Sequence, residues 1–189
     1  MRSAGLWAAV ALVLAASRPA EASVAQGFEG HLTFGYAQLF ATDAPGGSLA
    51  VGAGVDHGIA ESWRLGADID YDLLGSRQVN RGSEVANLDY SMLEALLLAH
   101  WEPKGLGPIG RVSFGPGFMS ARASLSTSGG GLAFEDLPID EFAPGVALDV
   151  TLISTKKSPV RAGVVFGARE AFLTDDTWMV LSARLAIHY

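Results

Sequence analysis

The sequence predicts an all-β protein, an eight-stranded antiparallel barrel of the transmembrane up-and-down type. The last eleven residues, 179–189, alternate between apolar and mixed polar side chains and end on the aromatic Tyr189. About eight segments of the chain share this period of two, which is typical of strands with two different faces. Hydrophobic residues make up 49% of the chain, yet beyond residue 22 no apolar run approaches the ~18 residues of a membrane helix. Alternating lipid-facing strands account for this combination.

The first 22 residues are expected to form a cleaved secretory signal peptide. Arg2 supplies a short positive region, residues 5–16 are apolar, and Ala20 and Ala22 place small side chains at the cleavage positions. The apolar run is too short for a membrane helix. Residues 23–189 would then form one barrel domain.

Composition excludes several classes of function. The chain has no cysteine, so neither a disulfide framework nor a thiolate metal site is available. Its formal net charge is −7, whereas nucleic-acid binding calls for a Lys- and Arg-rich surface. We therefore expect no nucleic-acid partner.

The eight strands are expected in the segments with the clearest alternation. Leu88, Tyr90 and Met92 are out of phase with Leu93 and the apolar residues that follow it, so a bulge is expected near Met92. The predicted strands cover residues 31–40, 48–57, 63–72, 88–101, 108–120, 142–153, 160–171 and 178–189.

The lengths of the connections support a membrane barrel with both chain ends on the periplasmic side. The connections at 58–62, 102–106 and 154–159 are short, as periplasmic turns are, and the two longest, 73–87 and 121–141, both fall on the opposite, outer side.

Aromatic residues are expected to form a girdle at each end of the strands. A soluble β-sandwich would use the same residues as core, but it would also need a second, polar outer face. The periplasmic girdle is predicted to contain Trp63, Trp101 and Tyr189, and the outer girdle Phe40, Tyr71, Tyr90, Phe118, Phe142 and Phe172.

This pattern resembles the small eight-stranded bacterial outer-membrane barrels, the OmpA/OmpX-like group. The resemblance covers residues 23–189 in pattern, and its only local motif is the terminal strand ending at Tyr189, where the group more often ends in Phe. The resemblance implies location in the outer membrane of a Gram-negative bacterium, contact with membrane lipid and lipopolysaccharide, and recognition of the terminal strand by the barrel insertion machinery.

The predicted inward face carries a nearly balanced set of charges in which every base is Arg. Arginine's planar fork suits paired carboxylates, and an eight-stranded barrel is narrow enough for side chains to fill. We interpret the set as a salt-bridge network that plugs the lumen; the alternative is a narrow ion path. The network comprises Arg64, Asp68, Asp70, Asp72, Glu94, Arg111, Asp149, Arg161, Arg169 and Arg184, with Asp56 on the same face.

No motif predicts a metal or a cofactor. The run Asp68-Ile69-Asp70-Tyr71-Asp72 resembles the start of a calcium loop, but Leu73 stands where that loop needs Gly. A lipid A hydrolase would need a His beside a Ser. His31, His57, His100 and His188 are all predicted at periplasmic strand ends, away from Ser113, Ser120 and Ser182, and are interpreted as interfacial residues.

The predicted function is therefore a non-enzymatic, structural or surface-interaction role in the cell envelope, exerted through the outer loops. Loops on rigid scaffolds usually carry binding, and the expected contacts are Arg122, Phe134 and Asp136 in the longest loop. The alternatives are a small passive, porin-like channel, a lipid A-modifying enzyme, and a soluble periplasmic barrel that binds an apolar ligand.

Overall fold

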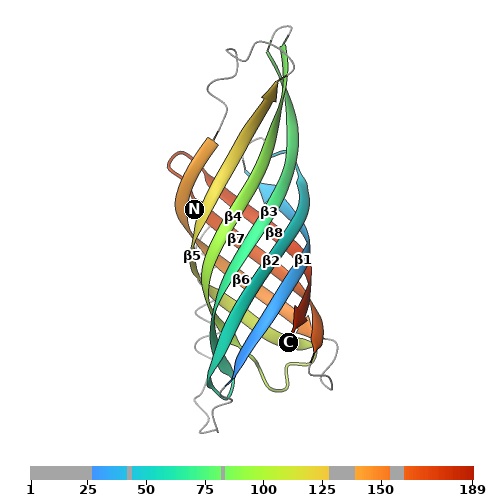
Figure 1. Cartoon of the computed structure of the whole chain (residues 1–189), viewed down its shortest axis with the longest axis vertical. Coiled ribbons are helices and arrows are strands. Elements are labelled where there is room, and N and C mark those ends of the chain that lie inside the picture. The colour runs from blue at the N-terminus through green and yellow to red at the C-terminus, as the bar shows by residue number, and fades with distance from the viewer. Residues whose placement is uncertain (1–26, 42–43, 82–83, 128–138, 154–159) are drawn as a thin grey trace.

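A computed structural model describes residues 27–41, 44–81, 84–127, 139–153 and 160–189 of the chain. Each strand pairs antiparallel with the next, and β1 pairs with β8, so the sheet closes on itself (Figure 1). The prediction of an all-β, eight-stranded antiparallel barrel is confirmed. The strands are β1 (Phe28–Phe40), β2 (Gly47–Ala60), β3 (Trp63–Arg81), β4 (Glu84–Trp101), β5 (Ile109–Thr127), β6 (Ile139–Ile153), β7 (Arg161–Phe172) and β8 (Thr177–His188).

The two terminal strands form the closing seam of the barrel. Their register runs from His31 opposite His188 to Phe40 opposite Met179. The last residue extends the seam, because Gly30 N donates to Tyr189 O (3.0 Å) and Tyr189 N donates to Gly30 O (2.9 Å). Tyr189 is therefore paired with Gly30 across the seam.

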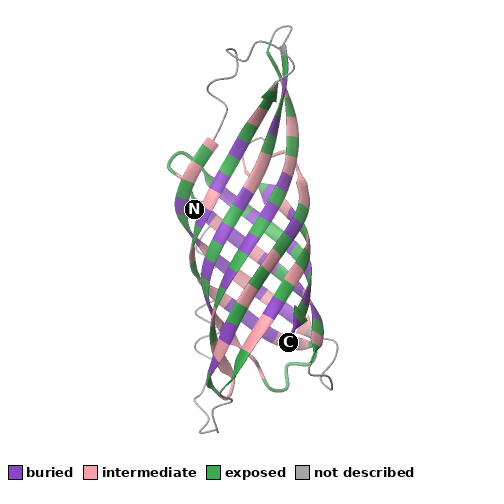
Figure 2. Ribbon diagram, in the orientation of Figure 1, coloured by how far each residue is buried: buried purple, intermediate pink, exposed green. Residues whose placement is uncertain are grey.

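Exposure alternates residue by residue along the strands (Figure 2). The outward face is apolar: Leu97 is 67% exposed, Phe142 68% and Leu185 62%. Exposing large apolar side chains on all sides of a closed sheet is unfavourable in water and favourable in lipid. This arrangement excludes the soluble-sandwich interpretation, in which the apolar faces would pack against one another.

No helix among the described residues is long and apolar enough to cross a membrane.

Three neighbouring strands are longer than predicted. The expected loop 73–87 consists largely of strand, because β3 continues to Arg81 and β4 begins at Glu84, and β5 continues past the predicted Ser120 to Thr127. We call residues 76–81, 84–91 and 122–127 the extension; it rises beyond the other strands at the top of Figure 1, at the end opposite the carboxy terminus. Polar residues suggested loops here, but the three strands pair with one another.

The expected bulge near Met92 is wrong. The β4–β5 register runs unbroken past Met92, and the register shift lies instead on β3, between Leu73 and Ser76. Gly75 at this shift has φ +86°, a conformation that favours glycine. Met92 and Leu88 are simply inward-facing apolar residues, so β4 keeps one phase throughout.

The interior is divided into two zones along the barrel axis. On most strands the inward residues are polar or charged near the Tyr189 end and become apolar toward the extension, as from His31 to Leu39 on β1. On β4 the pattern is interrupted, because Leu96 and Leu98 are buried between His100 and Glu94. Eight large apolar side chains of the core cluster are no more than 2% exposed, and six of them, all except Leu96 and Leu98, lie in the second zone. We call them the apolar plug: Leu39, Leu74, Met92, Met119, Trp178 and Val180.

Candidate functional site

The deeper part of the charged zone is organised around two buried arginines. Arg169 on β7 contacts three carboxylates: Glu94 Oε2 at 2.8 Å, Asp149 Oδ1 at 2.6 Å and Asp70 Oδ2 at 3.1 Å. Arg184 on β8 contacts Asp70 Oδ2 at 2.7 Å and Asp72 Oδ1 at 2.9 Å. Asp70 thus links the two arginines, and the side chains from five strands form one connected ion-pair network.

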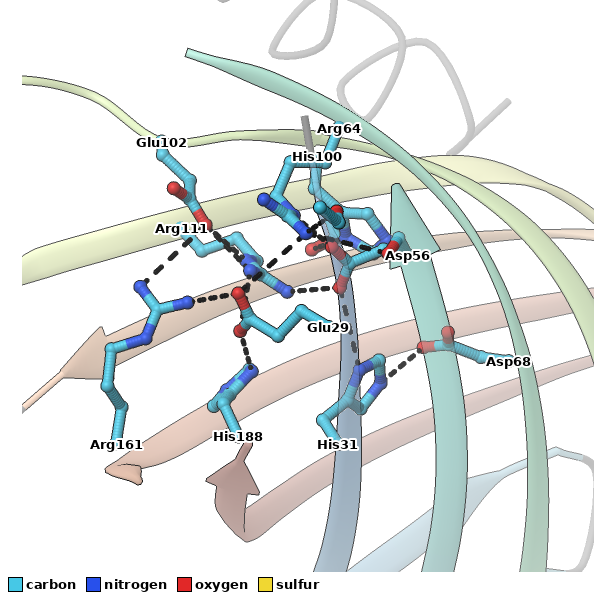
Figure 3. Close-up of polar contacts among 12 residues, drawn as sticks. Glu29, His31, Asp56, Arg64, Asp68, His100, Glu102, Arg111, Arg161 and His188 are labelled. Carbon is cyan, nitrogen blue, oxygen red and sulfur yellow. Dashed lines mark hydrogen bonds and ion pairs between the residues drawn. The ribbon is translucent and has the colours of Figure 1, made fainter. Parts of the chain in front are cut away.

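A second cluster fills the mouth of the barrel at the Tyr189 end (Figure 3). Arg111 is central: its guanidinium lies 2.9 Å from Asp56 Oδ2, 3.1 Å from Glu29 Oε1 and 2.6 Å from Glu102 Oε1. Arg64 pairs with Asp56, and Arg161 pairs with Glu29, on either side. Because Arg111 is only 2% exposed, this cluster closes the mouth rather than lining an open entrance.

Inward-facing glycines make room for these charges. A Cβ at Gly52 would collide with Asp70 Oδ1, and one at Gly167 would lie 2.5 Å from Asp149 Oδ1 and 2.6 Å from Ser182 Oγ. Strand glycines of this kind mark places where another group approaches the backbone closely. The carboxylates therefore fit into the lumen because these inward-facing positions have no side chain.

All ten predicted network residues point into the lumen, but they form two clusters rather than one. Arg169, Arg184, Asp70, Asp72, Glu94 and Asp149 make the deep cluster, and Arg64, Arg111 and Arg161 belong to the mouth. Asp68 pairs with His31 instead of an arginine. The predicted set lacks Glu29 and Glu102, because Glu29 precedes the predicted first strand and Glu102 follows the fourth strand, which ends at Trp101 as predicted.

Three of the four histidines are wrongly predicted as interfacial, because they lie inside the barrel. His31 is 6% exposed, His100 1% and His188 3%. His31 Nε2 lies 3.1 Å from Asp68 Oδ2, and His188 Nδ1 lies 3.0 Å from Glu29 Oε1. Only His57 faces outward, with its ring 4.7 Å from that of Phe28. Whether an imidazole faces the lumen or the outside depends on which of the two alternating faces of the strand its residue occupies, which we call strand parity, and not on its position along the strand.

The prediction that no histidine lies beside a candidate serine is also wrong. His100 Nδ1 lies 2.7 Å from Ser113 Oγ. A hydrolytic triad further requires an acid on the other ring nitrogen. His100 Nε2 is buried and has no hydrogen-bond partner among the described residues, so the pair forms no such triad.

A small polar cavity of about 30 Å³ separates the two clusters. His31, His100, Ser113, Arg169 and His188 contribute to its wall. This volume suits one or two water molecules rather than an organic substrate. Among the described residues, no three His, Asp or Glu side chains are gathered in a metal-binding arrangement.

All but one of the predicted girdle residues lie on the outward face. Trp63 and Trp101 are cross-strand partners whose rings stack 6.4 Å apart near the Tyr189 end, and Tyr189 itself is 62% exposed. Toward the extension, the exposed members are Phe40, Tyr71, Phe118, Phe142 and Phe172. The prediction is wrong for Tyr90, because this side chain is partly buried and packs against the core.

Of the predicted loop contacts, only Arg122 lies within the described residues; Phe134 and Asp136 fall outside them. Arg122 is on β5, where its Nη2 donates to Asp140 Oδ2 on β6 (2.9 Å). Both side chains are more than half exposed, at 61% and 66%. The hydrogen bond with Asp140 raises the pKa of Arg122 above its usual value.

No protein-family model matches the sequence, and no curated protein matches it either. Solved structures do match the fold. Ail, the attachment invasion locus protein of Yersinia pestis in complex with the heparin analogue sucrose octasulfate, is 11% identical, with a TM-score of 0.55 over 86% of this chain and 99% of that chain. OprG, an outer membrane protein of Pseudomonas aeruginosa, is 8% identical, with a TM-score of 0.54 over 87% and 97%.

A third match, a major outer membrane protein of Thermus thermophilus, is 10% identical, with a TM-score of 0.59 over 87% of this chain and 100% of that chain. At such low identity the shared property is the fold. The chain therefore has the fold of the small outer-membrane β-barrel proteins.

Proposed function

We propose that this chain is a non-enzymatic protein of the bacterial outer membrane whose function lies in contacts made by the extension. The observation that carries this proposal is the contrast between the two ends of the barrel. The lumen is filled by the deep cluster and the apolar plug, while β3, β4 and β5 rise together beyond the outer girdle. A barrel whose lumen is filled, and in which three strands extend beyond the others, is suited to binding a partner at the extension rather than to conducting a solute.

Surface presentation is tested first by location and accessibility. The protein should fractionate with outer membranes, shift its gel mobility on heating, and be cleaved at the extension when intact cells are treated with protease. Recovery in the soluble periplasmic fraction without detergent would support the soluble-barrel alternative and contradict the proposal.

A passive channel is the second candidate, favoured by the charged lumen. The apolar plug argues against it, because an ion would have to shed its hydration to pass Leu39, Met119 and Trp178. We expect no steady conductance in planar bilayers. A reproducible open level from the wild-type protein would make the channel the better function.

An enzyme acting on lipid A has less support. His100 and Ser113 are enclosed in the lumen at the Tyr189 end, whereas the substrate would lie in the outer leaflet. We expect purified lipid A to be recovered unchanged after incubation with the folded protein, and a new product would contradict this part of the proposal.

Two further proposals concern biogenesis. We infer that residues 1–22 direct export and are removed, which mass spectrometry of the membrane-inserted protein would test. We also infer that the barrel insertion machinery reads β8 and Tyr189, since these complete the closing seam.

A further inference from the structure

The outward face of the β3–β5 wall changes character at one level. Below that level its cross-strand rows are mainly apolar, as in Tyr71–Leu93–Ser120–Phe142. The next row toward the extension is Leu73–Ser91–Arg122–Asp140, where charges first appear on this face. Because the apolar band of a membrane barrel ends at its aromatic girdle, this row marks the outer boundary of the lipid.

Two complete rows of polar side chains stand directly above this boundary. Their members come from three strands, all point outward, and all are exposed. Five of the six are uncharged amides or hydroxyls. We call them the polar rows: Ser76–Asp89–Ser124 and Gln78–Asn87–Ser126.

The height of the polar rows places them beside lipid headgroups. Asn87 is four residues beyond Ser91 on β4, which is roughly 13 Å along the strand at ~3.3 Å per residue. With a tilt of about 40°, the rows rise about 5–10 Å above the boundary. Since the rows continue the lipid-facing side of the wall, they face sideways across the membrane plane, toward neighbouring headgroups.

The chemistry of the polar rows fits neutral, hydroxyl-rich groups. Amides offer both donors and acceptors, and hydroxyls do the same. The hydroxyls of Ser124 and Ser126 donate long hydrogen bonds, of 3.4 and 3.5 Å, to the carbonyls of Asp89 and Asn87. The polar rows contain no Lys or Arg, the side chains that bind phosphate best, so they are not suited to recognising phosphate.

We propose that the polar rows bind the saccharide headgroups of the glycolipid in the outer leaflet, and so fix the extension against the sugar layer of the membrane. This inference rests on the proposed outer-membrane location and names the partner of the extension. The continuity of the rows with the lipid-facing surface selects a membrane saccharide over a soluble protein partner.

The test compares the full-length mature barrel in vesicles of three compositions. One contains phospholipid alone, one adds lipid A, and one adds rough lipopolysaccharide with a complete core oligosaccharide. Hydrogen exchange of the backbone amides of residues 76–89 is measured in each. We expect exchange to slow at least about fivefold with the core-bearing glycolipid and to change little with lipid A.

The variant Gln78→Ala/Asn87→Ala/Ser126→Ala removes one whole row and should abolish the slowing. A matching valine triple variant, with stronger strand preference, covers the case in which the alanines loosen the extension. Asp175→Ala/Thr177→Ala, exposed near the same end of the barrel but outside the rows, should retain the full effect.

Equal protection by lipid A and by the core-bearing glycolipid would overturn the proposal, as would full protection in both row variants. Flotation with vesicles and the heat-modifiable mobility shift are recorded for every sample. Failure of these two controls would count against the outer-membrane barrel itself, whereas failure of the exchange comparison alone would count against saccharide binding.

Discussion

Arg169 on β7 reaches across the lumen to Glu94 on β4, with Nε 2.8 Å from Oε2, and the side chains of both are almost fully buried. The same guanidinium holds Asp149 on β6 and Asp70 on β3. One cation therefore ties four strands of the barrel together through the interior, in addition to the ladder bonds that join neighbouring strands.

Replacing Arg169 by Met should destabilise the barrel strongly. The change leaves Glu94, Asp149 and Asp70 without this buried partner, and breaking a buried pair on one side costs about 3–5 kcal/mol. Urea unfolding from vesicles, followed by gel mobility, would measure the loss. Arg122→Met is the matched control, since its pair with Asp140 is exposed and should contribute less than ~1 kcal/mol. Equal losses in the two variants would argue against a structural role for the deep cluster.

Strand parity made the barrel and its lumenal charges predictable from sequence. Along β8, exposed and buried residues alternate without a break from Thr177 to His188, as the period-two pattern predicts. The same parity places Arg184 inside the barrel and Leu185 outside it. Local alternation is sufficient here because a membrane barrel has only an inner and an outer face.

The extension and the histidines could not be predicted in the same way. Ser76, Gln78 and Asn87 are residue types common in loops, and they are in strands here because β3, β4 and β5 pair with one another. Parity gives His31 and His188 the inward direction, but both lie near strand ends, where parity alone does not show whether the mouth is closed around them. The mouth is closed by acidic partners such as Glu29, which is distant from His188 in sequence.

Truncating Trp178 should open the apolar plug. Trp178 is 2% exposed and its ring lies 5.8 Å from that of Tyr90. Trp178→Ala would remove the largest side chain of the plug and cost about 3–5 kcal/mol of stability. In planar bilayers we expect short-lived conducting events that the wild-type protein lacks. Trp178→Phe, which keeps the plug filled, should remain silent; a silent alanine variant would mean that the deep cluster alone closes the lumen.

Adding a methyl group at Gly52 should disturb the deep cluster. Its Cβ would meet Asp70 Oδ1 and Thr33 Oγ1, and Asp70 cannot swing away freely because Arg169 and Arg184 hold it. We expect Gly52→Ala to lose about 1–3 kcal/mol in urea unfolding, as overpacked sites do. Gly27→Ala, where nothing lies within 4 Å, should be nearly neutral. If Gly52→Ala unfolds at the same urea concentration as the wild type, the side chains of the deep cluster can rearrange to accept the added methyl group.

The aromatic ring of Tyr189 should matter more than its hydroxyl for closing the barrel. The ring covers Gly30, where a Cβ would lie 2.7 Å from Tyr189 Cε2, and the two backbones exchange hydrogen bonds. Tyr189→Phe should fold into vesicles within about twofold of the wild-type rate, because aromatic side chains anchor strand ends at the membrane interface. Tyr189→Ala should fold severalfold more slowly, and Gly30→Val should do the same by displacing the ring. Phe142→Ala removes a comparable exposed aromatic away from the seam and should slow folding less. If the Phe142 and Tyr189 alanine variants fold equally slowly, Tyr189 acts as one more girdle residue and the seam contact with Gly30 has no special role.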